Sequence, residues 1–433
     1  MKTLANSQLG DEFMDWPVYM ARAIEIAANV INTNPNPRVG CVLVNNSYGG
    51  AVPGDAGLIA ATATATTTTT LSPPLRATGA YQLIGQGWHE FPGEPHAEIA
   101  ALEDAHRKQH CVIGATAFVS LEPCAHHGRT GPCAVALVNA QIARVVIACK
   151  DPNPEVSGKG IEILETAGIE VFHLKEFETR AKALNPGFHK RHELGLPWVR
   201  LKLASSLDGR TALSNGESQW ITGTKARSDV QKMRLASSAI ITGVNSVLKD
   251  DPRMNVRVDE LDLTDNERRL NQRSLAVQPL KVVLDSALRT PTTAQILASG
   301  KVVIFTKADQ SSCSDFTSKL RQGHQVQVVQ AKDSDSSPSR GVDLRFVLEY
   351  LAQMHCNDVL VESGTVVSSA FIDQGWVDEL VVYLAPKFMG ADAMPLLNKT
   401  GIASMDELLK FEIKSLAQFD NDIKLTMTPL NDQ

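Results

Sequence analysis

Four residues in two short segments carry metal and proton chemistry. His96 is followed two residues later by Glu98, and Cys124 and Cys133 each come directly after a proline. One imidazole and two thiolates make a three-ligand zinc set, which leaves a fourth coordination position for a water molecule. A structural zinc is normally closed by a fourth protein ligand, so this set indicates a catalytic zinc held by His96, Cys124 and Cys133.

Glu98 supplies the base that such a site needs. Two thiolates cancel the charge of the zinc and weaken it as a Lewis acid, but a carboxylate beside the bound water can take its proton and pass it to a leaving amine. This order of histidine, glutamate and two cysteines is typical of zinc deaminases. We therefore predict hydrolytic deamination of an amino-substituted heterocycle. Two alternatives stay open: His126 or His127 could close a structural zinc site, or the cysteines could be ordinary buried thiols.

Length, charge and cysteine usage narrow the class of protein. The chain has 433 residues, which favours two or three domains, and a formal net charge of −6. This charge gives no general attraction to a polyanion and argues against a nucleic-acid partner. No leader-like or membrane-length apolar run is present, and seven scattered cysteines do not indicate a disulfide framework. We expect a cytoplasmic protein with reduced thiols and no membrane partner.

The zinc residues are expected at the starts of two helices. The helix His96–His106 would carry the histidine and Glu98 in its first turn, and the buried strand Ala117–Ser120 would deliver Cys124. A second helix would open at Pro132. Free N–H groups at helix starts favour thiolates and anions. Further strands are predicted at Val39–Val44, Gln82–Trp88 and Arg144–Ala148.

The chain divides into three predicted parts. Residues 1–150 form the first domain, interrupted by a low-complexity insertion, 46–80, that we expect to be a mobile, passive loop. Residues 151–197 are a connector that completes this domain with a helix and a strand, and residues 198–433 form a second domain.

The second domain reads as an α/β sheet with crossover helices. Strand-like and helix-like runs alternate in its first part, whereas its last strands are expected to be antiparallel. A highly charged run, Asp259–Ser274, is expected to be an exposed excursion. The predicted strands are Val199–Ala204, Ala239–Thr242, Lys281–Asp285, Lys301–Thr306, Asp358–Glu362, Val377–Leu384, Phe411–Phe419 and Ile423–Met427, and the predicted helices are Lys225–Ala236 and Val342–Met354.

A phosphate-binding turn is the clearest chemical feature of this domain. No G-x-G-x-x-G follows its first strand, but a buried strand ends near Glu362, Gly364 turns the chain, and a helix begins. The free N–H groups and hydroxyls of this helix start could hold a pyrophosphate. Lys202 and Asp208 lie at the end of the first strand and could transfer protons, or they could be solvated charges.

Charged residues on both sides of the predicted strand Ala239–Thr242 could hold a sugar phosphate. The guanidinium fork offers paired donors to phosphate oxygens. The alternative is an ordinary solvated surface. These residues are Arg234, Asp250, Asp251 and Arg257.

Longer motifs resemble those of the bifunctional riboflavin-biosynthesis deaminase–reductases, over nearly the whole chain. Eight residues separate the two cysteines, whereas general nucleoside and base deaminases usually have two between them. The other motifs are Asn36-Pro37-Arg38-Val39-Gly40-Cys41, Glu94-Pro95-His96-Ala97-Glu98, Asp151-Pro152-Asn153-Pro154, Ser206-Leu207-Asp208-Gly209-Arg210, Gly216-Glu217-Ser218-Gln219-Trp220-Ile221-Thr222 and Asp250-Asp251-Pro252.

The resemblance implies two successive reactions on one small molecule, a pyrimidine ribosylamine phosphate. A cytidine-deaminase-like zinc domain would hydrolyse the 2-amino group of 2,5-diamino-6-(5-phosphoribosylamino)pyrimidin-4(3H)-one. A dihydrofolate-reductase-like domain would then reduce the ribosyl group to ribityl with NADPH. The implied cofactors are Zn²⁺ and NADPH, and self-association into a homo-oligomer stays open.

The resemblance also implies roles for individual residues. His96, Cys124 and Cys133 match the zinc ligands and Glu98 the proton shuttle. Lys202 and Asp208 are our candidates for polarising or protonating the opening ribose. Deaminase substrate contacts are expected at Asn36, His126 and Arg129, and reductase substrate contacts at Ser218, Arg234, Met254, Arg257 and Glu362. NADP contacts are expected at Ala204, Trp220, Ser246, Asp250, Ser286, Gly364, Thr365, Val366, Val367, Ser368, Ser369 and Ala370.

Two rival functions are testable against this one. The chain could be a zinc deaminase of another pyrimidine or nucleoside with an inactive reductase domain, or a zinc-stabilised binding protein without turnover. A departure from the family pattern is Ala204, which stands where a glycine is common. The nicotinamide would therefore meet an extra methyl group, without loss of a reacting group.

Overall fold

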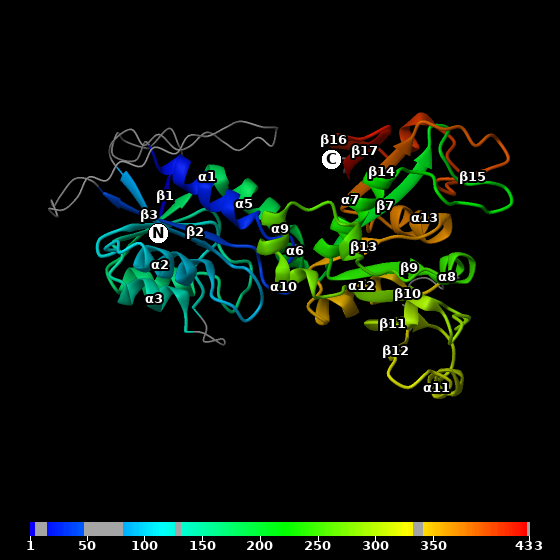
Figure 1. The fold of residues 1–433 in the computed structure, drawn as a ribbon, viewed down its shortest axis with the longest axis horizontal. Helices are drawn as coiled ribbons and strands as arrows, with labels where there is room; N and C mark the ends of the chain where they lie inside the picture. The colour runs from blue at the N-terminus through cyan, green and yellow to red at the C-terminus, as the bar shows by residue number, and fades with distance from the viewer. Residues whose placement is uncertain (5–14, 47–80, 126–130, 332–340, 431–433) are drawn as a thin grey trace. The chain divides into compact units, whose positions relative to one another are not determined.

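A computed structural model describes residues 1–4, 15–46, 81–125, 131–331 and 341–430 of the chain (Figure 1). These residues form two compact units. The first unit comprises Met1–Asn29 and Arg38–Leu184, and the second comprises Val30–Pro37 and Asn185–Gln433. The junction after Leu184 falls inside the predicted connector. The insertion expected at 46–80 lies outside the described residues, apart from the backbone of Asn46.

The first unit is built on a six-stranded sheet with the order β1-β6-β5-β4-β2-β3. β2 runs antiparallel to both of its neighbours, and the other pairs are parallel. The strands are β1 (Lys2–Leu4), β2 (Gly40–Asn46), β3 (Tyr81–Trp88), β4 (Thr116–Val119), β5 (Arg144–Ile147) and β6 (Glu170–Leu174). The helices are α1 (Trp16–Ala27), α2 (Ala97–Arg107), α3 (Cys133–Asn139), α4 (Lys159–Thr166), α5 (Glu178–Leu184) and the short 3₁₀ turn η3 (Lys175–Phe177).

Helix α2 packs unusually close to β3 because small residues meet at their interface. A Cβ on Gly87 would lie 2.4 Å from the backbone nitrogen of Ala101, and a Cβ on Gly85 would lie 2.5 Å from the carbonyl oxygen of the same residue. Ala97, Ala101 and Ala105 are fully buried on this face of the helix. Glycine allows such a close approach of two backbones. This packing fixes the start of α2, where His96 stands.

The second unit contains a nine-stranded sheet with the order β12-β11-β10-β9-β13-β7-β14-β17-β16. The strands from β12 to β14 are parallel to their neighbours, and β17 and β16 close one edge as an antiparallel pair. Its strands are β7 (Trp198–Ser206), β9 (Ala239–Gly243), β10 (Leu280–Leu284), β11 (Lys301–Thr306), β12 (Gln325–Gln330), β13 (Asp358–Val361), β14 (Glu379–Ala385), β16 (Phe411–Phe419) and β17 (Asp422–Pro429). A separate small pair joins β8 (Arg210–Ala212) to β15 (Met394–Pro395).

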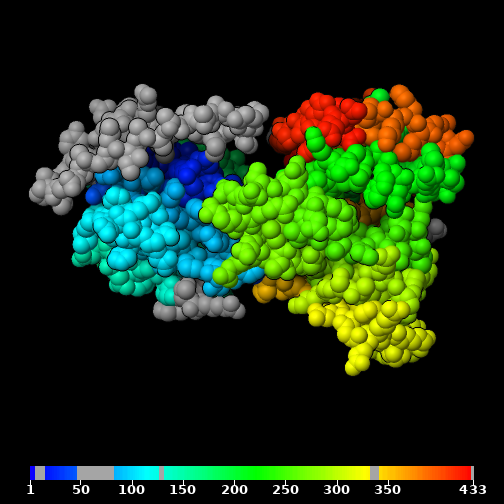
Figure 2. All heavy atoms as spheres, viewed as in Figure 1, coloured from blue at the N-terminus to red at the C-terminus, as the bar shows by residue number. Residues whose placement is uncertain are grey.

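Helices pack on both faces of this sheet, α12 and α13 on one face and α7 on the other. The helices of the second unit are α6 (Pro186–Leu194), α7 (Thr224–Ala236), α8 (Val244–Asp250), α9 (Asp265–Leu270), α10 (Gln272–Leu275), α11 (Gln310–Ser318), α12 (Leu344–Gln353) and α13 (Thr365–Asp373), with 3₁₀ turns η4 (Val258–Glu260), η5 (Gln295–Leu297) and η6 (Met405–Glu407). Figure 2 shows the two edges of the sheet at opposite ends of this unit, β16 and β17 in red and the α11 region in yellow. No helix in the described ranges is both long and apolar enough to cross a bilayer.

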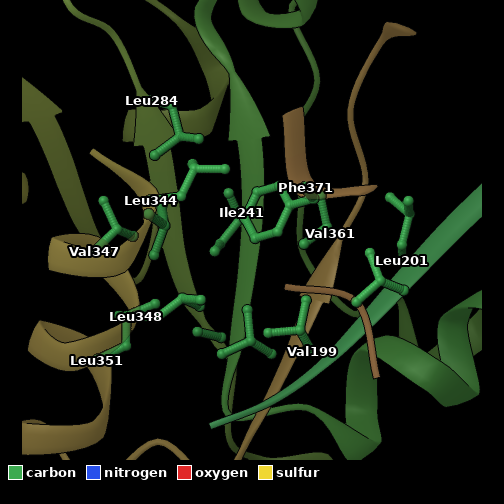
Figure 3. Packing of buried hydrophobic residues seen from close by; sticks show 14 of the residues in the cluster. Val199, Leu201, Ile241, Leu284, Leu344, Val347, Leu348, Leu351, Val361 and Phe371 are labelled. Carbon is green, nitrogen blue, oxygen red and sulfur yellow. The ribbon is translucent and has the colours of Figure 1, made fainter. Parts of the chain in front are cut away.

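The main core of the second unit lies between the sheet and helices α12 and α13. Leu344, Val347, Leu348 and Leu351 project from one side of α12 toward the strands, as Figure 3 shows. Residues spaced by three and four share one helix face, which is why the sequence predicts this helix. On the opposite face of the sheet, a second cluster packs α7 against the strands through Val230 and Met233, among others.

Three expectations about the second unit need correction. β14 was expected among the antiparallel strands but runs parallel to β7, and only its other neighbour, β17, is antiparallel. A parallel partner is natural because α13 provides the crossover before it. β12 was not predicted, since its side chains are exposed or half-buried at the edge of the sheet. The charged run Asp259–Ser274 is not simply exposed.

That charged run contains buried residues that hold another part of the chain. Asn271 and Ser274 are almost fully buried. The Asn271 side chain accepts a hydrogen bond of 2.7 Å from the Ile31 N–H, and the Ser274 hydroxyl donates one of 2.8 Å to the Asn32 carbonyl. These bonds explain why Val30–Pro37 groups with the second unit.

Candidate active sites

The structure brings the three predicted zinc ligands together in the first unit. His96 is the residue before helix α2, and Cys133 is the first residue of α3. The Nδ1 atom of His96 lies 3.5 Å from the Sγ of Cys124 and 3.3 Å from the Sγ of Cys133. All three ligand atoms lie within 4.8 Å of one another. Two soft sulfur donors and one imidazole suit zinc, so the residues present fit this metal.

The backbone and the side chains around Cys124 favour its thiolate. The hydrogen bond from Cys133 lowers the pKa of Cys124 to about 4, and the contact with His96 acts in the same direction. The N–H of Cys133 also donates to the Cys124 sulfur over 3.3 Å. The thiolate is the form that binds a metal, so Cys124 is prepared for coordination, whereas the hydrogen bond to Cys124 and burial raise the pKa of Cys133.

Glu98 lies in the first turn of α2 and is 3 % exposed. Burial, followed by the negative charge of Cys124, raises the pKa of Glu98 to about 7. A hydrogen bond links its carboxyl group to Cys133. The structure therefore places a carboxyl group that can both accept and donate a proton beside the ligand atoms.

Sequence reasoning missed two residues that support the ligands. The ring of His89 packs edge-on against the ring of His96 with 5.3 Å between centroids, and its Nδ1–H donates to the Pro95 carbonyl over 3.1 Å. Burial lowers the pKa of His89, so the neutral ring is favoured. The only signal for it in the sequence is its position seven residues before His96.

The second supporting contact lies beneath the Cys124 loop. A Cβ on Gly160 in α4 would lie 1.9 Å from the carbonyl oxygen of Pro123. The buried Glu122 carboxylate accepts long bonds of 3.4 Å from the N–H groups of Asp151 and Ile161. The loop before Cys124 thus rests directly on the start of α4, which a pattern of residue types cannot reveal.

Of the three residues expected to contact the deaminase substrate, the structure describes only Asn36. Asn36 belongs to the segment Val30–Pro37 of the second unit, where its N–H donates to the Thr33 carbonyl over 2.9 Å. His126 and Arg129 lie outside the described residues.

The second unit places Arg234 and Glu362 in a largely buried ion pair, with 12 % and 10 % of their side chains exposed. The Arg234 guanidinium donates from Nε and Nη2 to the two Glu362 oxygens over 2.6 and 2.9 Å, and from Nη1 to the Asn255 carbonyl over 3.1 Å. Burial opposes ionisation of Glu362, but the charge and hydrogen bonds of Arg234 outweigh it and lower its pKa. The Met254 sulfur lies 3.9 Å from Nη2. Lys202 also interacts electrostatically with this pair. Four residues that the sequence predicts for the reductase site therefore lie together: Lys202, Arg234, Met254 and Glu362.

Lys202 projects from the middle of β7 beside the Arg234–Glu362 pair. Burial lowers the pKa of Lys202, and the charge of Glu362 partly offsets this while that of Arg234 adds to it. A lysine with a lowered pKa can donate a proton more readily near neutral pH.

Asp208, the other proton-transfer candidate, is held in a different way. Its carboxylate accepts hydrogen bonds from the Ser206 hydroxyl and from the N–H groups of Met389 and Gly390. The bond from Ser206 is the main reason why its pKa is lowered to about 2. At neutral pH the ionised Asp208 carboxylate has no proton to donate. Its hydrogen bonds instead indicate that Asp208 holds the loop at Met389 in place.

The expected pyrophosphate loop lies at the start of α13. Gly364 precedes the helix, and its N–H donates to the Ser246 hydroxyl over 3.3 Å. Three hydroxyls in the loop have protein partners. Thr365 donates to the Pro395 carbonyl over 3.0 Å, Ser368 donates to the Ser363 carbonyl over 3.2 Å, and Ser369 accepts from the Asn398 N–H over 2.8 Å. Val366 is exposed, Val367 and Ala370 pack partly against the core, and Ser368 is fully buried.

The remaining predicted positions lie in a strand, at the end of a helix and on loops. Ala204 is paired with Tyr383 in the sheet, and Trp220 is exposed, with the Arg227 guanidinium 4.4 Å from its ring centroid. Ser218 and Asp250 line one open hollow of about 490 Å³ with Lys249.

The last two residues predicted for the reductase site are Arg257, a substrate contact, and Ser286, an NADP contact. Arg257 pairs through Nε with Glu260 over 2.5 Å. Ser286 directly follows the buried Asp285 after β10, and its carbonyl accepts the Lys307 N–H over 3.0 Å.

Two protein-family models match the chain, one in each part. Residues 16–149 match the cytidine and deoxycytidylate deaminase zinc-binding region, and residues 197–425 match the RibD C-terminal domain.

The similarity to individual relatives extends over nearly the whole chain. The chain is 37 % identical over 413 residues to the riboflavin biosynthesis protein RibD of Haemophilus influenzae, covering 95 % of this chain and 97 % of that protein. It is 36 % identical over 408 residues to RibD of Escherichia coli, covering 94 % and 97 %. The solved structure of Acinetobacter baumannii RibD superposes with a TM-score of 0.77 at 39 % identity, covering 97 % of this chain and all of that one.

Proposed function

Because the chain belongs to the RibD family of riboflavin-biosynthesis enzymes, a zinc deaminase joined to an NADPH-dependent reductase, we propose which of its residues carry the two reactions. The deaminase reaction is hydrolysis of the 2-amino group of the diaminopyrimidine ribosylamine phosphate. The reductase reaction converts the ribosyl group of the deaminated product to ribityl. The observation that carries the proposal is the His96–Cys124–Cys133 cluster with a buried carboxyl group beside it.

In the deaminase unit, His96, Cys124 and Cys133 hold the zinc. A zinc ion at this site would lower the pKa of a water molecule and so supply a nucleophile. Glu98 takes a proton from the attacking water and delivers it to the departing amine, which leaves as ammonia. The support is the burial of Glu98, which raises its pKa to about 7, so the carboxyl group can both take and give a proton near neutral pH. His126, Arg129 and Asn36 are proposed to bind the substrate.

In the reductase unit, Lys202 donates the proton. NADPH, when bound, would supply a hydride to the ribosyl carbon that carries the amine, and the ring oxygen of the ribose needs a proton to become a hydroxyl. Lys202 is buried beside Glu362, so its ammonium group is held next to a carboxylate while burial lowers its pKa. Arg234 neutralises Glu362 and, with Met254, Arg257 and Ser218, forms the proposed substrate surface.

The cofactor is proposed to cross the carboxyl ends of the parallel strands. The loop Gly364–Ala370 would hold the pyrophosphate, with Ala204 and Trp220 beside the nicotinamide. Ser246, Asp250 and Ser286 would contact the remaining cofactor. The bond from Gly364 N–H to the Ser246 hydroxyl supports this arrangement, because it ties two of these positions together.

We also propose the domain limits 1–150 with a completing connector, 151–197, and a reductase domain, 198–433. The support is that β6 and helices α4 and α5 join the first sheet after residue 150. Limited proteolysis with mass mapping should yield a first fragment that keeps the connector and a second fragment that begins near residue 198.

Two further proposals concern the protein as a whole. It works in the cytoplasm, which is consistent with seven cysteines that all lack disulfide partners. It self-associates through the edge strand β16, where Ile413 and Leu416 are exposed. Light scattering coupled to gel filtration would test the second point, and a mass of one chain would contradict it.

A single assay tests both reactions. Zinc-loaded protein receives the diaminopyrimidine ribosylamine phosphate, and ammonia and NADPH are followed in the same tube. Release of ammonia followed by stoichiometric loss of NADPH is the expected result. Ammonia without NADPH loss would instead support a deaminase with an inactive reductase domain.

A further inference from the structure

The direction of the bound cofactor follows from the proposed reductase function, on which this inference rests. β13 leads into the pyrophosphate loop, and β7 carries Ala204 beside the nicotinamide. In the sheet, β7 lies on one side of β13, while β9 and then β10 lie on the other. The adenosine half therefore extends across β9 toward β10, two strand spacings or roughly 10 Å from β13.

A rigid turn follows β10 at this place. Asp285 is fully buried, and its Oδ2 accepts hydrogen bonds of 2.7 Å from both the N–H and the hydroxyl of Thr290. Leu288 adopts a positive φ of 51°, and its N–H donates to the Asp285 carbonyl over 3.1 Å. These bonds fix the backbone of the residue between them, Arg289, whose side chain is exposed.

The Arg289 side chain reaches back toward the pyrophosphate loop. Its Nη2 donates to the Asn245 side chain over 2.9 Å, and the next residue, Ser246, accepts the Gly364 N–H. Within the described ranges, no carboxylate forms an ion pair with Arg289. Its positive charge is therefore available on the adenosine side of the proposed cofactor site.

We propose that Arg289 binds the 2′-phosphate of NADPH and sets the preference for NADPH over NADH. The guanidinium group offers paired N–H donors that match phosphate oxygens. Only Nη2 bonds Asn245, so the Nε and Nη1 donors remain for a phosphate. NADH has a neutral hydroxyl at the same position, which gains nothing from the charge. Ser286, at the other side of the turn, adds a hydroxyl donor.

The competing explanation is that Arg289 only ties the turn to α8. In that case its loss would weaken both dinucleotides to the same extent, because both need the same pyrophosphate loop. The ratio of the two affinities therefore separates a phosphate contact from a structural one.

The test is a fluorescence titration of the full-length, zinc-loaded protein with NADPH and with NADH, without the pyrimidine substrate. Arg289→Gln should weaken NADPH binding by about 10- to 100-fold, the usual effect of losing hydrogen bonds to a charged group. NADH binding should stay unchanged. Arg289→Lys, which keeps the charge but not the fork, should give an intermediate loss for NADPH.

A matched control is Arg345→Gln on α12, where the guanidinium pairs with Glu349 on the surface. This variant should bind both dinucleotides as the parent protein does. Equal weakening of NADPH and NADH by Arg289→Gln, or no change in either, would overturn the proposal. If the parent protein binds neither dinucleotide, the proposed reductase function itself fails, which is a distinct outcome.

Discussion

At the scale of single residues, the first unit offers separate groups for metal binding and for the proposed proton transfer. His96, Cys124 and Cys133 offer the ligand atoms, whereas Glu98 is buried beside them without being needed as a ligand. The two tasks can therefore be removed one at a time. Such a separation distinguishes an enzyme from a protein that uses zinc only for stability.

Glu98→Gln should abolish deamination but keep the metal. The amide fills the same space but cannot shuttle a proton, so ammonia release should fall by about 10²- to 10⁴-fold, the usual contribution of a general acid–base group. Zinc content by atomic absorption should stay at the parent level. Glu103→Gln, an exposed change on the same helix, is the control. Full-rate deamination by the Glu98 variant would contradict the mechanism.

Lys281, in the second unit, provides a pH-dependent stability effect. It is 1 % exposed, its amine donates to the Ile296 carbonyl over 2.5 Å, and burial lowers its pKa from 10.5 to about 8. Below pH 8 the amine is charged in both the folded and unfolded states, and the cost of burying that charge is fully present. Above pH 10.5 it is neutral in both, so its contribution to the free energy of unfolding rises with pH between these values.

Lys281→Met should therefore stabilise the protein near pH 7 by up to about 3 kcal/mol, less the contribution of the lost hydrogen bond. The gain over the parent protein should shrink as the pH rises from 8 toward 10.5. Urea denaturation at several pH values measures it, with the exposed Lys301→Met as control. A gain that does not vary with pH would contradict the role of burial.

At the scale of elements, the zinc site depends on close packing between helices and the strands that deliver the ligands. The Pro123 carbonyl lies so close to Gly160 of α4 that no side chain fits between them. Sequence alone predicted the ligand types and the helices that carry them, because both are local patterns. It could not predict this contact or the Arg234–Glu362 pair, since each joins residues far apart in the chain.

Gly160→Ala should disturb the Cys124 loop. The added Cβ must push the Pro123 carbonyl or α4 away, and forced overpacking of this kind costs about 1–3 kcal/mol. We expect a lower melting temperature and weaker zinc retention in competition with a chelator. Gly131→Ala is a matched control, because a Cβ there meets no atom of the described residues within 4 Å. Equal zinc retention by the two variants would show that the packing does not support the site.

At the scale of the whole molecule, the two reactions use separate chemistry in separate units. The described part of the chain gathers a three-ligand metal set in the first unit, and the proposed reductase residues all belong to the second. The alternation of strands and helices predicted both sheets in outline. The edge strand β12 and the parallel direction of β14 were missed because they depend on tertiary pairing.

Removal of zinc should therefore stop one reaction and spare the other. After dialysis against a chelator, ammonia release from the diaminopyrimidine should be lost and should return on addition of Zn²⁺. Oxidation of NADPH with the already deaminated ribosylamine phosphate should continue at the parent rate. A parallel loss of both activities would contradict this separation.

The grouping of Val30–Pro37 with the second unit has a consequence for how the enzyme can be divided. The chain enters the second unit's fold between α1 and β2, then returns to complete the first sheet. A gene fragment that ends at Leu184 would encode every strand of the deaminase sheet, yet leave Ile31 and Asn32 without Asn271 and Ser274. Separating the two activities into independent polypeptides therefore requires redesign of this segment as well as a stop codon.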